Sequence, residues 1–224
     1  MLNTVYQLKR PRQFEAVFKE IDLSSPGLLV RPTHLSICNA DQRYYQGTRP
    51  QEILNAKLPM ALIHEGIGRV VYDPSGNFGT GERVVMIPNL PKEQDDIIAE
   101  NYLRSSRFRA SGADGFLQEY VQTVPDRVLR LPEQINPVVA SFTELVSVAY
   151  HALSRFFANA HARMDEAAVW GDGNLGYITA LLLRYLRPDT RLYAVGVHEE
   201  KLSYFTFADE VFLTTELKDD FAFD

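Results

Sequence analysis

The sequence lacks the features that mark several common protein classes. Cys38 is the only cysteine among 224 residues, so no internal disulfide can form, and we expect a reducing, cytoplasmic location. No stretch approaches the roughly 18 apolar residues of a membrane span, and the N-terminus has no signal-peptide pattern. The net charge is −6 and the basic residues are scattered, so we expect neither nucleic-acid nor membrane binding.

The first part of the chain has the pattern of a β-rich domain. Short apolar runs alternate with turn-forming segments, for example at residues 73–77 and 79–81. Strands are predicted at residues 28–30, 68–72, 83–87 and 116–121. Many short strands separated by turns are typical of a barrel or a sandwich. We therefore predict a β-barrel or β-sandwich domain over residues 1–136, with a long polar loop that contains some helix over residues 91–113.

The second part changes to an alternation of helices and strands. Residues 137–157 carry apolar side chains at helical spacing, and further helices are predicted at residues 177–186 and 203–207. Short apolar runs predict strands at residues 167–170, 192–197 and 211–213. This β-α-β-α-β order predicts a doubly wound parallel sheet within residues 137–224.

A glycine motif, Gly171-x-Gly173-x-x-Gly176, joins the first of these strands to the helix that follows. The first glycine allows a tight turn, the second lets the backbone approach a pyrophosphate, and the third lets the helix pack on the strand. The N–H groups at the start of the helix also favour phosphate binding. The predicted cofactor contacts are Gly171, Gly173, Asn174, Leu175 and Gly176. The alternative is a glycine-rich turn that binds no ligand.

The residue at the end of the second strand, about 20 residues after Gly176, indicates which dinucleotide binds. In NAD-binding proteins this residue is a carboxylate that binds the ribose. This position falls on Gly196, which has no side chain. Because His198 and Lys201 follow and can meet the charge of a 2′-phosphate, we predict NADPH as the cofactor. If Glu199 instead folds back to the ribose, the cofactor is NAD.

A small set of side chains has the chemistry of a catalytic metal site. Cys38 is followed by Asp41, and the pair His64-Glu65 comes later in the chain. A catalytic zinc uses about three protein ligands and one open position, and a thiolate, an imidazole and a carboxylate suit it. The alternative for Cys38 is a small buried apolar side chain. Glu144, on an otherwise apolar helix, needs a partner such as a metal or an arginine.

Taken in order, these motifs resemble the zinc-dependent medium-chain dehydrogenase/reductase family. The matching segments are Cys38-x-x-Asp41, His64-Glu65-Gly66-x-Gly68, Gly81-Glu82-Arg83-Val84, residues 144–151 and the glycine motif. The resemblance implies a GroES-like catalytic domain followed by a Rossmann domain, with the active site between them. Segments 38–47, 58–65, 100–102, 111–116 and 170–177 look like the branch that reduces D-ribulose 5-phosphate to D-ribitol 5-phosphate with NADPH. That product supplies CDP-ribitol for teichoic acids or capsules.

The resemblance also implies roles for individual residues at the metal. Cys38, His64 and Glu144 would bind one catalytic zinc per chain, with Glu65 as a further or alternating ligand. Asp41 would accept the spare N–H of His64. Family members commonly have a hydroxyl residue where this chain has Ala40. The proton would therefore come from water, Glu65 or a substrate hydroxyl.

The substrate phosphate needs cationic partners. Arg43 lies in the segment that follows Cys38, and its planar guanidinium suits phosphate. Arg49 and Lys57 are weaker candidates for the phosphate. Tyr44 and Tyr45 are candidates for hydrogen bonds to the substrate, including its sugar hydroxyls. The alternative for Arg43 is a surface ion pair.

A complete Rossmann domain has two β-α-β-α-β halves, and this sequence contains about one, ending near a predicted fourth strand at residues 221–224. We therefore expect a C-terminally truncated form with an incomplete Rossmann sheet. The resemblance implies a cytidylyltransferase partner and a homodimeric full-length form. Two other functions stay open: a zinc dehydrogenase of an unphosphorylated polyol or alcohol, and a non-catalytic relic or assembly subunit.

Overall fold

The structure, a computed structural model, describes residues 1–217 except residues 26 and 162. It divides into two compact units, Met1–Glu144 and Leu145–Asp224. The sequence placed the boundary after residue 136, whereas in the structure α3 (Pro137–Ala140) and the start of α4 (Thr143–Asn159) group with the first unit. Within the described residues, no helix has the length and apolarity needed to cross a membrane.

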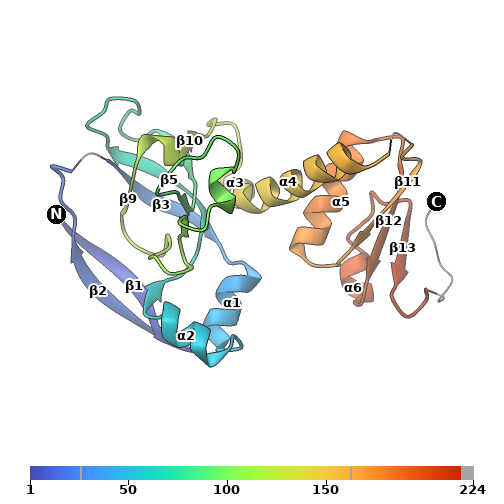
Figure 1. The fold of residues 1–224 in the computed structure, drawn as a ribbon, viewed down its shortest axis with the longest axis horizontal. Helices are drawn as coiled ribbons and strands as arrows, with labels where there is room; N and C mark the ends of the chain where they lie inside the picture. The colour runs from blue at the N-terminus through green and yellow to red at the C-terminus, as the bar shows by residue number, and fades with distance from the viewer. Residues whose placement is uncertain (26, 162, 218–224) are drawn as a thin grey trace. The chain divides into compact units, whose positions relative to one another are not determined.

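The first unit is built from antiparallel strands arranged in two main sheets (Figure 1). The smaller sheet has the order β2-β1-β4, and the larger one has the order β10-β6-β5-β3-β9. The strands are β1 (Leu2–Arg10), β2 (Gln13–Glu20), β3 (Leu28–Ser36), β4 (Met60–Ala61), β5 (Glu65–Tyr72), β6 (Arg83–Met86), β9 (Val121–Thr123) and β10 (Val128–Arg130). The predicted strands at 28–30, 68–72 and 83–87 correspond to β3, β5 and β6. The prediction at 116–121 overlaps β9 only at its end.

Sequence analysis did not identify the hairpin formed by β1 and β2. The inward positions of β1 include Asn3 and Gln7, so its apolar alternation is broken. Their side chains are bonded to distant groups: Asn3 Nδ2 donates to Tyr120 O at 2.9 Å, and Gln7 Nε2 donates to Asp114 Oδ1 at 2.9 Å. Buried polar side chains with such partners are stable in a strand.

Two glycines allow β3 and β5 to lie close together. A Cβ atom at Gly68 would lie 2.6 Å from the backbone oxygen of Arg31, and one at Gly66 would lie 2.9 Å from the backbone oxygen of His34. Both distances are too short for any side chain. The motif Gly66-x-Gly68 therefore has a packing role beside the core. That core contains Leu28, Val30, Val70, Val84, Met86, Phe116, Val121 and Val128.

The remaining elements of this unit are short. Helices α1 (Asn39–Gln46) and α2 (Gln51–Lys57) lie between β3 and β4, and the 3-10 helix η2 (Pro125–Arg127) precedes β10. The predicted polar loop at 91–113 contains the 3-10 helix η1 (Glu100–Tyr102), and β8 (Arg107–Phe108) pairs with β7 (Asn89–Leu90). An ion pair between Glu100 and Arg127 joins this loop to η2.

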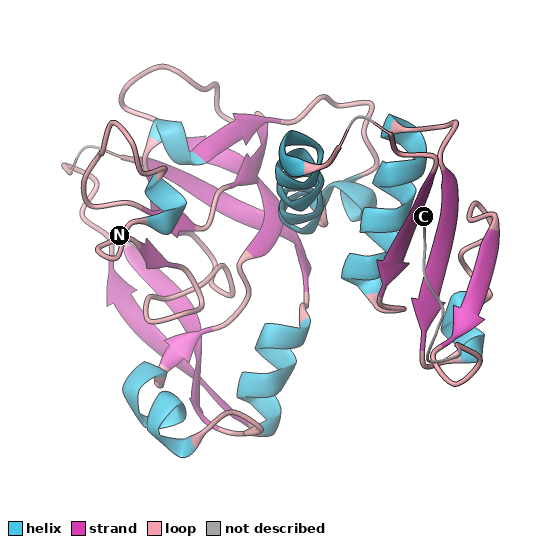
Figure 2. Cartoon of the chain, turned by 45° about the vertical axis from the view of Figure 1, so that its right-hand side comes forward, coloured by secondary structure: helices cyan, strands magenta, loops and turns pink. Residues whose placement is uncertain are grey.

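The second unit contains a parallel sheet in the order β11-β12-β13, drawn as three neighbouring arrows in Figure 2. Its elements are β11 (Glu166–Trp170), α5 (Asn174–Leu186), β12 (Arg191–Gly196), α6 (Glu199–Leu202) and β13 (Glu210–Leu213). The predicted β-α-β-α-β order is therefore confirmed. The fourth strand predicted at 221–224 lies outside the described residues.

The helix predicted at residues 203–207 is wrong, because the helical turn lies earlier, in α6. Residues 203–207 form turns. Phe205 and Phe207 pack edge-on against Tyr177, with ring centroids 5.2 and 5.3 Å apart. Arg184 Nε donates to Phe207 O at 3.1 Å, which fixes the chain in a non-helical path. The spacing of aromatic residues therefore reflects this packing and not a helix.

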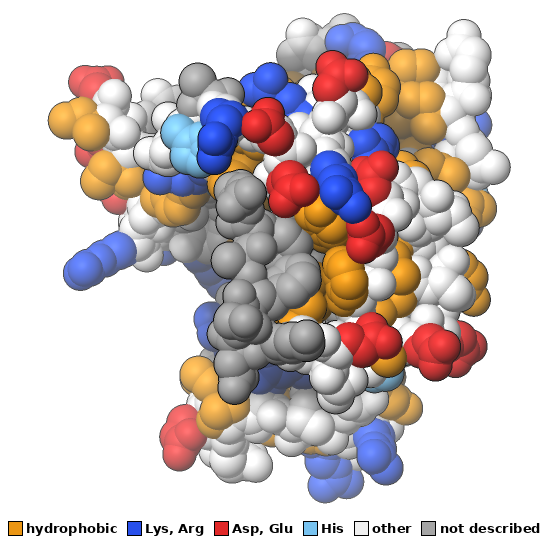
Figure 3. Space-filling view, turned by 90° about the vertical axis from the view of Figure 1, so that its right-hand side faces the viewer, with side chains coloured by type: hydrophobic (Ala, Val, Ile, Leu, Met, Phe, Trp, Pro, Cys, Tyr) orange, Lys and Arg blue, Asp and Glu red, His pale blue; other side chains and the backbone are white. Residues whose placement is uncertain are grey.

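Charges of both signs are mixed on the surface of the second unit. Ion pairs join Arg184 to Asp209 and Arg191 to Glu210. Figure 3 shows one face of the molecule, on which Lys and Arg side chains lie among acidic and apolar ones. Exposed pairs of this kind contribute about 0–1 kcal/mol each, so the apolar core provides most of the stability.

The third glycine of the motif packs directly against the first. A Cβ atom at Gly176 would lie 1.9 Å from Gly171 O, whereas one at Gly173 would meet no atom within 4 Å. Gly171 itself has φ 138, a conformation that favours glycine. The close contact between β11 and α5 therefore depends on Gly176.

We expect Gly176→Ala to lower the free energy of unfolding by about 2–3 kcal/mol or more, because the added methyl group would force α5 away from β11. The matched variant Gly173→Ala should change stability by no more than about 1 kcal/mol, since only an N-cap preference is lost. Urea denaturation followed by circular dichroism measures both. Equal stability of the two variants would contradict the packing role of Gly176.

Candidate functional site

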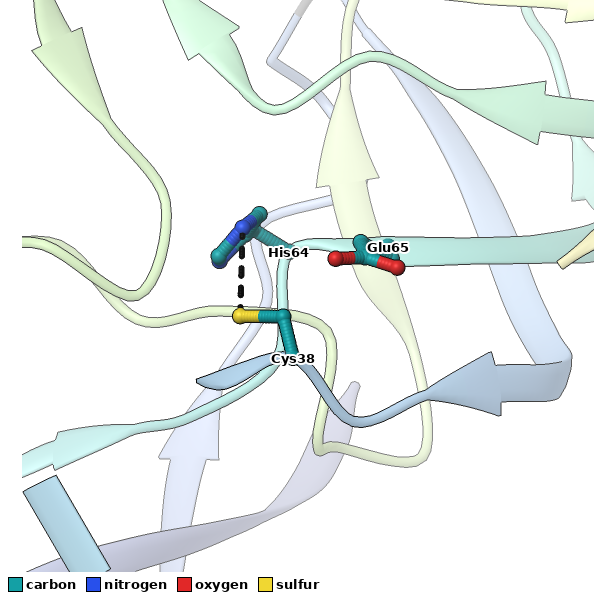
Figure 4. Close-up of side chains that lie close together, drawn as sticks. All are labelled: Cys38, His64 and Glu65. Carbon is teal, nitrogen blue, oxygen red and sulfur yellow. Dashed lines mark hydrogen bonds between the residues drawn. The ribbon is translucent and has the colours of Figure 1, made fainter. Parts of the chain in front are cut away.

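Two segments of the first unit bring the predicted metal ligands together. Cys38 is the residue before α1, and His64 lies between β4 and β5, where Glu65 begins β5. One donor atom from each of these three residues lies within 4.8 Å of the other two. Cys38 Sγ and His64 Nε2 are 3.7 Å apart and face each other in Figure 4.

The turn that carries His64 is held by the segment that precedes β9. Gly115 N donates to Ala61 O at 2.8 Å, and Phe116 N donates to Ile63 O at 2.6 Å. A Cβ atom at Gly115 would lie 2.3 Å from Ile63 O, so only glycine fits. Ile63 has φ 70, a left-handed conformation that costs about 1–3 kcal/mol for a residue other than glycine. The hydrogen bonds maintain this strained turn and thereby fix the position of His64.

Asp41 connects this turn to Cys38. Its Oδ2 accepts the Cys38 backbone N–H at 3.1 Å and the Cys38 thiol at 3.1 Å, and its Oδ1 accepts the Ile63 N–H at 2.9 Å. The sequence analysis expected Asp41 to accept from His64, but the structure gives its hydrogen bonds to Cys38 and Ile63 instead. Asp41 is 3% exposed, and it therefore positions the thiol and the backbone before His64.

Glu65 is fixed by a residue that the sequence analysis missed. Ser36 Oγ donates to Glu65 Oε2 at 2.6 Å and also lies 3.0 Å from Ser141 O. Glu65 is 2% exposed and Ser36 is 5% exposed. A hydroxyl residue at the end of an apolar strand, two positions before Cys38, is the sequence signal that could have indicated this role.

The electrostatic surroundings of Cys38 and Glu144 favour a cation near them. Burial raises the pKa of the Cys38 thiol to about 12, and the Asp41 carboxylate contributes to the rise. Burial also raises the pKa of Glu144 to about 7, with further contributions from the charges of Glu65 and Asp41. A divalent cation would stabilise the thiolate and the carboxylates that burial disfavours.

The geometry fits a zinc ion for two of the predicted ligands. Two ligands of one tetrahedral zinc, at about 2.3 Å for sulfur and about 2.1 Å for nitrogen, lie about 3.6 Å apart. The observed separation of Cys38 Sγ and His64 Nε2 is 3.7 Å. Glu65 belongs to the same group of donor atoms, whereas Glu144 does not. The role of Glu144 as a ligand stays a prediction.

The predicted substrate-binding residues have different surroundings. Arg43 is exposed on α1. Tyr44 is 3% exposed within an apolar cluster, and the Arg49 guanidinium carbon lies 4.3 Å from its ring centroid. Arg49 and Tyr44 therefore interact with each other. Their contact with a substrate stays a prediction, as does that of Arg43.

A pocket of about 550 Å³ is lined in part by Asp41, the residue that accepts a hydrogen bond from the Cys38 thiol. Its other lining residues are Phe14, Ile37, Gln42, Tyr45, Leu62, Ile63 and Leu117. The rings of Phe14 and Tyr45 stack with centroids 5.9 Å apart. Most of these walls are apolar, so the pocket suits the apolar part of a ligand better than a phosphate.

The glycine motif borders a second pocket, of about 380 Å³, in the other unit. It is lined by Asp172, Gly173, Asn174, Tyr177, Lys201, Tyr204 and Phe205. Gly173 is the N-cap of α5, where the first N–H groups are available to a phosphate. Three predicted residues, Gly173, Asn174 and Lys201, therefore line one cavity. Sequence analysis missed Asp172 and Tyr204, which lack a distinctive spacing.

Comparison with known proteins identifies related chains. Residues 25–133 match the model of the alcohol dehydrogenase GroES-like domain. The ribulose-5-phosphate reductase of Bacillus spizizenii is 53% identical over 224 residues, which are 100% of this chain and 66% of that protein. The crystal structure of Staphylococcus aureus TarJ in complex with NADPH is 42% identical, with a TM-score of 0.82, and covers 100% of this chain and 63% of that one.

A more distant structure shows the same fold. L-idonate 5-dehydrogenase from Escherichia coli has a TM-score of 0.87 at 23% identity, covering 98% of this chain and 65% of that one. The predicted order of a GroES-like domain and part of a Rossmann sheet is confirmed. The chain spans about 66% of the length of the reductase from Bacillus spizizenii. Its sequence and fold place this chain in the medium-chain dehydrogenase/reductase family, whose members have the alcohol dehydrogenase GroES-like domain.

Proposed function

We propose that the protein reduces D-ribulose 5-phosphate to D-ribitol 5-phosphate with NADPH and a catalytic zinc. The observation that carries the proposal is the convergence of a thiol, an imidazole and a carboxylate at Cys38, His64 and Glu65. The 53% identity to a ribulose-5-phosphate reductase supports the choice of substrate, and the NADPH complex of TarJ supports the choice of cofactor.

Cys38 and His64 would hold the zinc, with Glu65 or Glu144 completing the site. The metal would supply Lewis-acid polarisation of the substrate carbonyl. Asp41 keeps the thiol and the His64 turn in place, and this preorganisation reduces reorganisation during the reaction. Because residue 40 is alanine, the proton for the product hydroxyl would come from Glu65, water or a substrate hydroxyl.

Other residues would bind the two phosphorylated ligands. The turn from Gly171 to Gly176 would hold the NADPH pyrophosphate, and His198 and Lys201 would bind its 2′-phosphate. Arg43 would bind the substrate phosphate through a charge-assisted contact. We further propose that the whole protein is a cytoplasmic homodimer that hands its product to a cytidylyltransferase.

The purified chain should contain about one zinc ion. NADPH oxidation on addition of ribulose 5-phosphate tests whether this chain, with an incomplete Rossmann sheet, is active or an inactive fragment. We expect Cys38→Ala and His64→Ala to reduce the zinc content at least about tenfold, because each removes a ligand. Plasma mass spectrometry and NADPH absorbance measure both properties, with His161→Ala as an exposed histidine control. Zinc without turnover would favour an inactive fragment, and absence of zinc from the purified, zinc-supplied chain would exclude the metal site.

The pH dependence of zinc affinity should identify the role of Glu144. The Cys38 thiol, with a pKa of about 12, must lose its proton on binding, so the zinc Kd should fall about tenfold per pH unit in mildly alkaline solution. If Glu144 is a ligand, protonation of its carboxyl, with a pKa of about 7, weakens binding further as the pH falls below 7. The pH dependence of the wild type should then exceed that of Glu144→Gln. Chelator competition measures it, and equal slopes would exclude Glu144.

The apolar pocket favours a second candidate function. A cavity lined by Ile37, Leu62 and Leu117 offers few hydrogen-bond donors to a sugar phosphate. It would suit a zinc-dependent dehydrogenase of an unphosphorylated polyol or alcohol with an apolar part. The two functions differ in their need for a cation at the substrate.

Arg43→Ala should separate these functions. If Arg43 binds the substrate phosphate, we expect the Kd for ribulose 5-phosphate to rise about 10- to 100-fold, since a hydrogen bond to a charged group contributes roughly 1.5–3 kcal/mol. The Kd for unphosphorylated ribulose should not change. Calorimetry on the zinc-loaded chain measures both, with Arg31→Ala as an exposed arginine control. An equal response to the two sugars would favour the unphosphorylated substrate.

A further inference from the structure

Asp172 occupies the space beside the end of β12 where a ribose-binding side chain is usually found. Asp172 lies between Gly171 and Gly173, the first two glycines of the motif, and Gly196 is the last residue of β12. A Cβ atom at Gly196 would lie 2.6 Å from Asp172 Cβ and 2.7 Å from Asp172 Oδ2. The carboxylate that NAD-binding proteins place at the end of this strand is therefore replaced by one from the glycine motif.

The carboxylate is directed at the turn between β12 and α6. Asp172 Oδ2 accepts the Val197 N–H at 2.8 Å, the His198 N–H at 2.7 Å and His198 Nδ1 at 2.9 Å. The Asp172 side chain is only 10% exposed. One oxygen atom thus fixes the backbone of this turn and the orientation of the His198 ring.

This arrangement determines which edge of His198 is available. Because Nδ1 donates to Asp172, Nε2 is the ring atom that remains for a ligand. Lys201 Nζ lies 3.5 Å from His198 Nδ1, so the ammonium and the imidazole form one cluster. Asp172 and Lys201 both line the pocket of about 380 Å³ beside the glycine motif.

We propose that Asp172 is a positioning residue for cofactor choice, which orients His198 so that the imidazole and the Lys201 ammonium receive the 2′-phosphate of NADPH. The inference rests on the proposed function for the identity of the cofactor. Burial acts to raise the pKa of Asp172, but the hydrogen bonds from His198 and Val197 outweigh it and lower the pKa to about 2. The carboxylate therefore stays charged at neutral pH.

The test uses the whole chain and two probes that differ only in the 2′-phosphate, 2′,5′-ADP and 5′-AMP. We expect the wild type to bind 2′,5′-ADP more tightly in calorimetry. Asp172→Asn should weaken 2′,5′-ADP binding about tenfold and leave 5′-AMP binding unchanged, because a charge-assisted hydrogen bond to the imidazole is lost. Glu200→Gln, which makes the same charge change on α6, should leave both affinities unchanged.

A spectroscopic measurement on the wild type needs no variant to fold. The ¹⁵N spectrum should show His198 with a hydrogen-bonded proton on Nδ1 before and after nucleotide addition. We expect 2′,5′-ADP, but not 5′-AMP, to shift the Nε2 resonance. Loss of the Nδ1 hydrogen bond on binding 2′,5′-ADP would overturn the positioning role.

The outcomes separate this inference from the proposed function. A wild type that prefers 5′-AMP would overturn the choice of NADPH itself. A wild type that prefers 2′,5′-ADP, with Asp172→Asn keeping the same preference, would overturn only the role of Asp172. A selective loss of 5′-AMP affinity in Asp172→Asn would also overturn it, because the carboxylate would then bind the ribose directly.

Discussion

The candidate metal site of this protein, formed by Cys38, His64 and Glu65, depends on the hydrogen bonds of one buried carboxylate. Asp41 accepts from the Cys38 thiol and backbone with one oxygen and from the Ile63 N–H with the other. Without these bonds, a strained left-handed residue and a buried thiol would lose the contacts that fix them. The direction of His64 follows from the turn at Ile63, so Asp41 controls two candidate ligands although it binds neither a metal nor a substrate in the proposed scheme.

Glycines at four motif positions provide a second constraint common to both units. Gly66 and Gly68 permit contact between β3 and β5, Gly115 permits contact with the turn before His64, and Gly176 permits contact between β11 and α5. At each of these glycines, an added Cβ atom would lie too close to neighbouring atoms. The motifs that this sequence shares with the family therefore combine two kinds of residue. Some have candidate functional side chains, and others are glycines that allow two backbone segments to lie close together.

The sequence predicted features that depend on local patterns and missed those that depend on distant partners. Apolar runs located β3, β5 and β6, and the glycine motif located the β11–α5 turn. The pairing of β1 with β2 was missed because Asn3 and Gln7 are buried against groups that are distant in the chain. The same limitation explains Ser36, whose hydroxyl meets Glu65, and the wrong acceptor predicted for His64. Residue type predicted the candidate ligands, but spacing alone did not predict the hydrogen bonds that position them.

The backbone contact at Gly115 has a consequence for when the candidate metal site forms. Cys38 and His64 are synthesised early, but the turn before His64 is bonded to residues 115–117, and Ser36 lies beside Ser141. These contacts close loops of many residues and form only after the later segments have left the ribosome. Assembly of the candidate metal site is therefore a late event in the folding of the chain, and an early nascent chain presents its thiol and imidazole as independent groups.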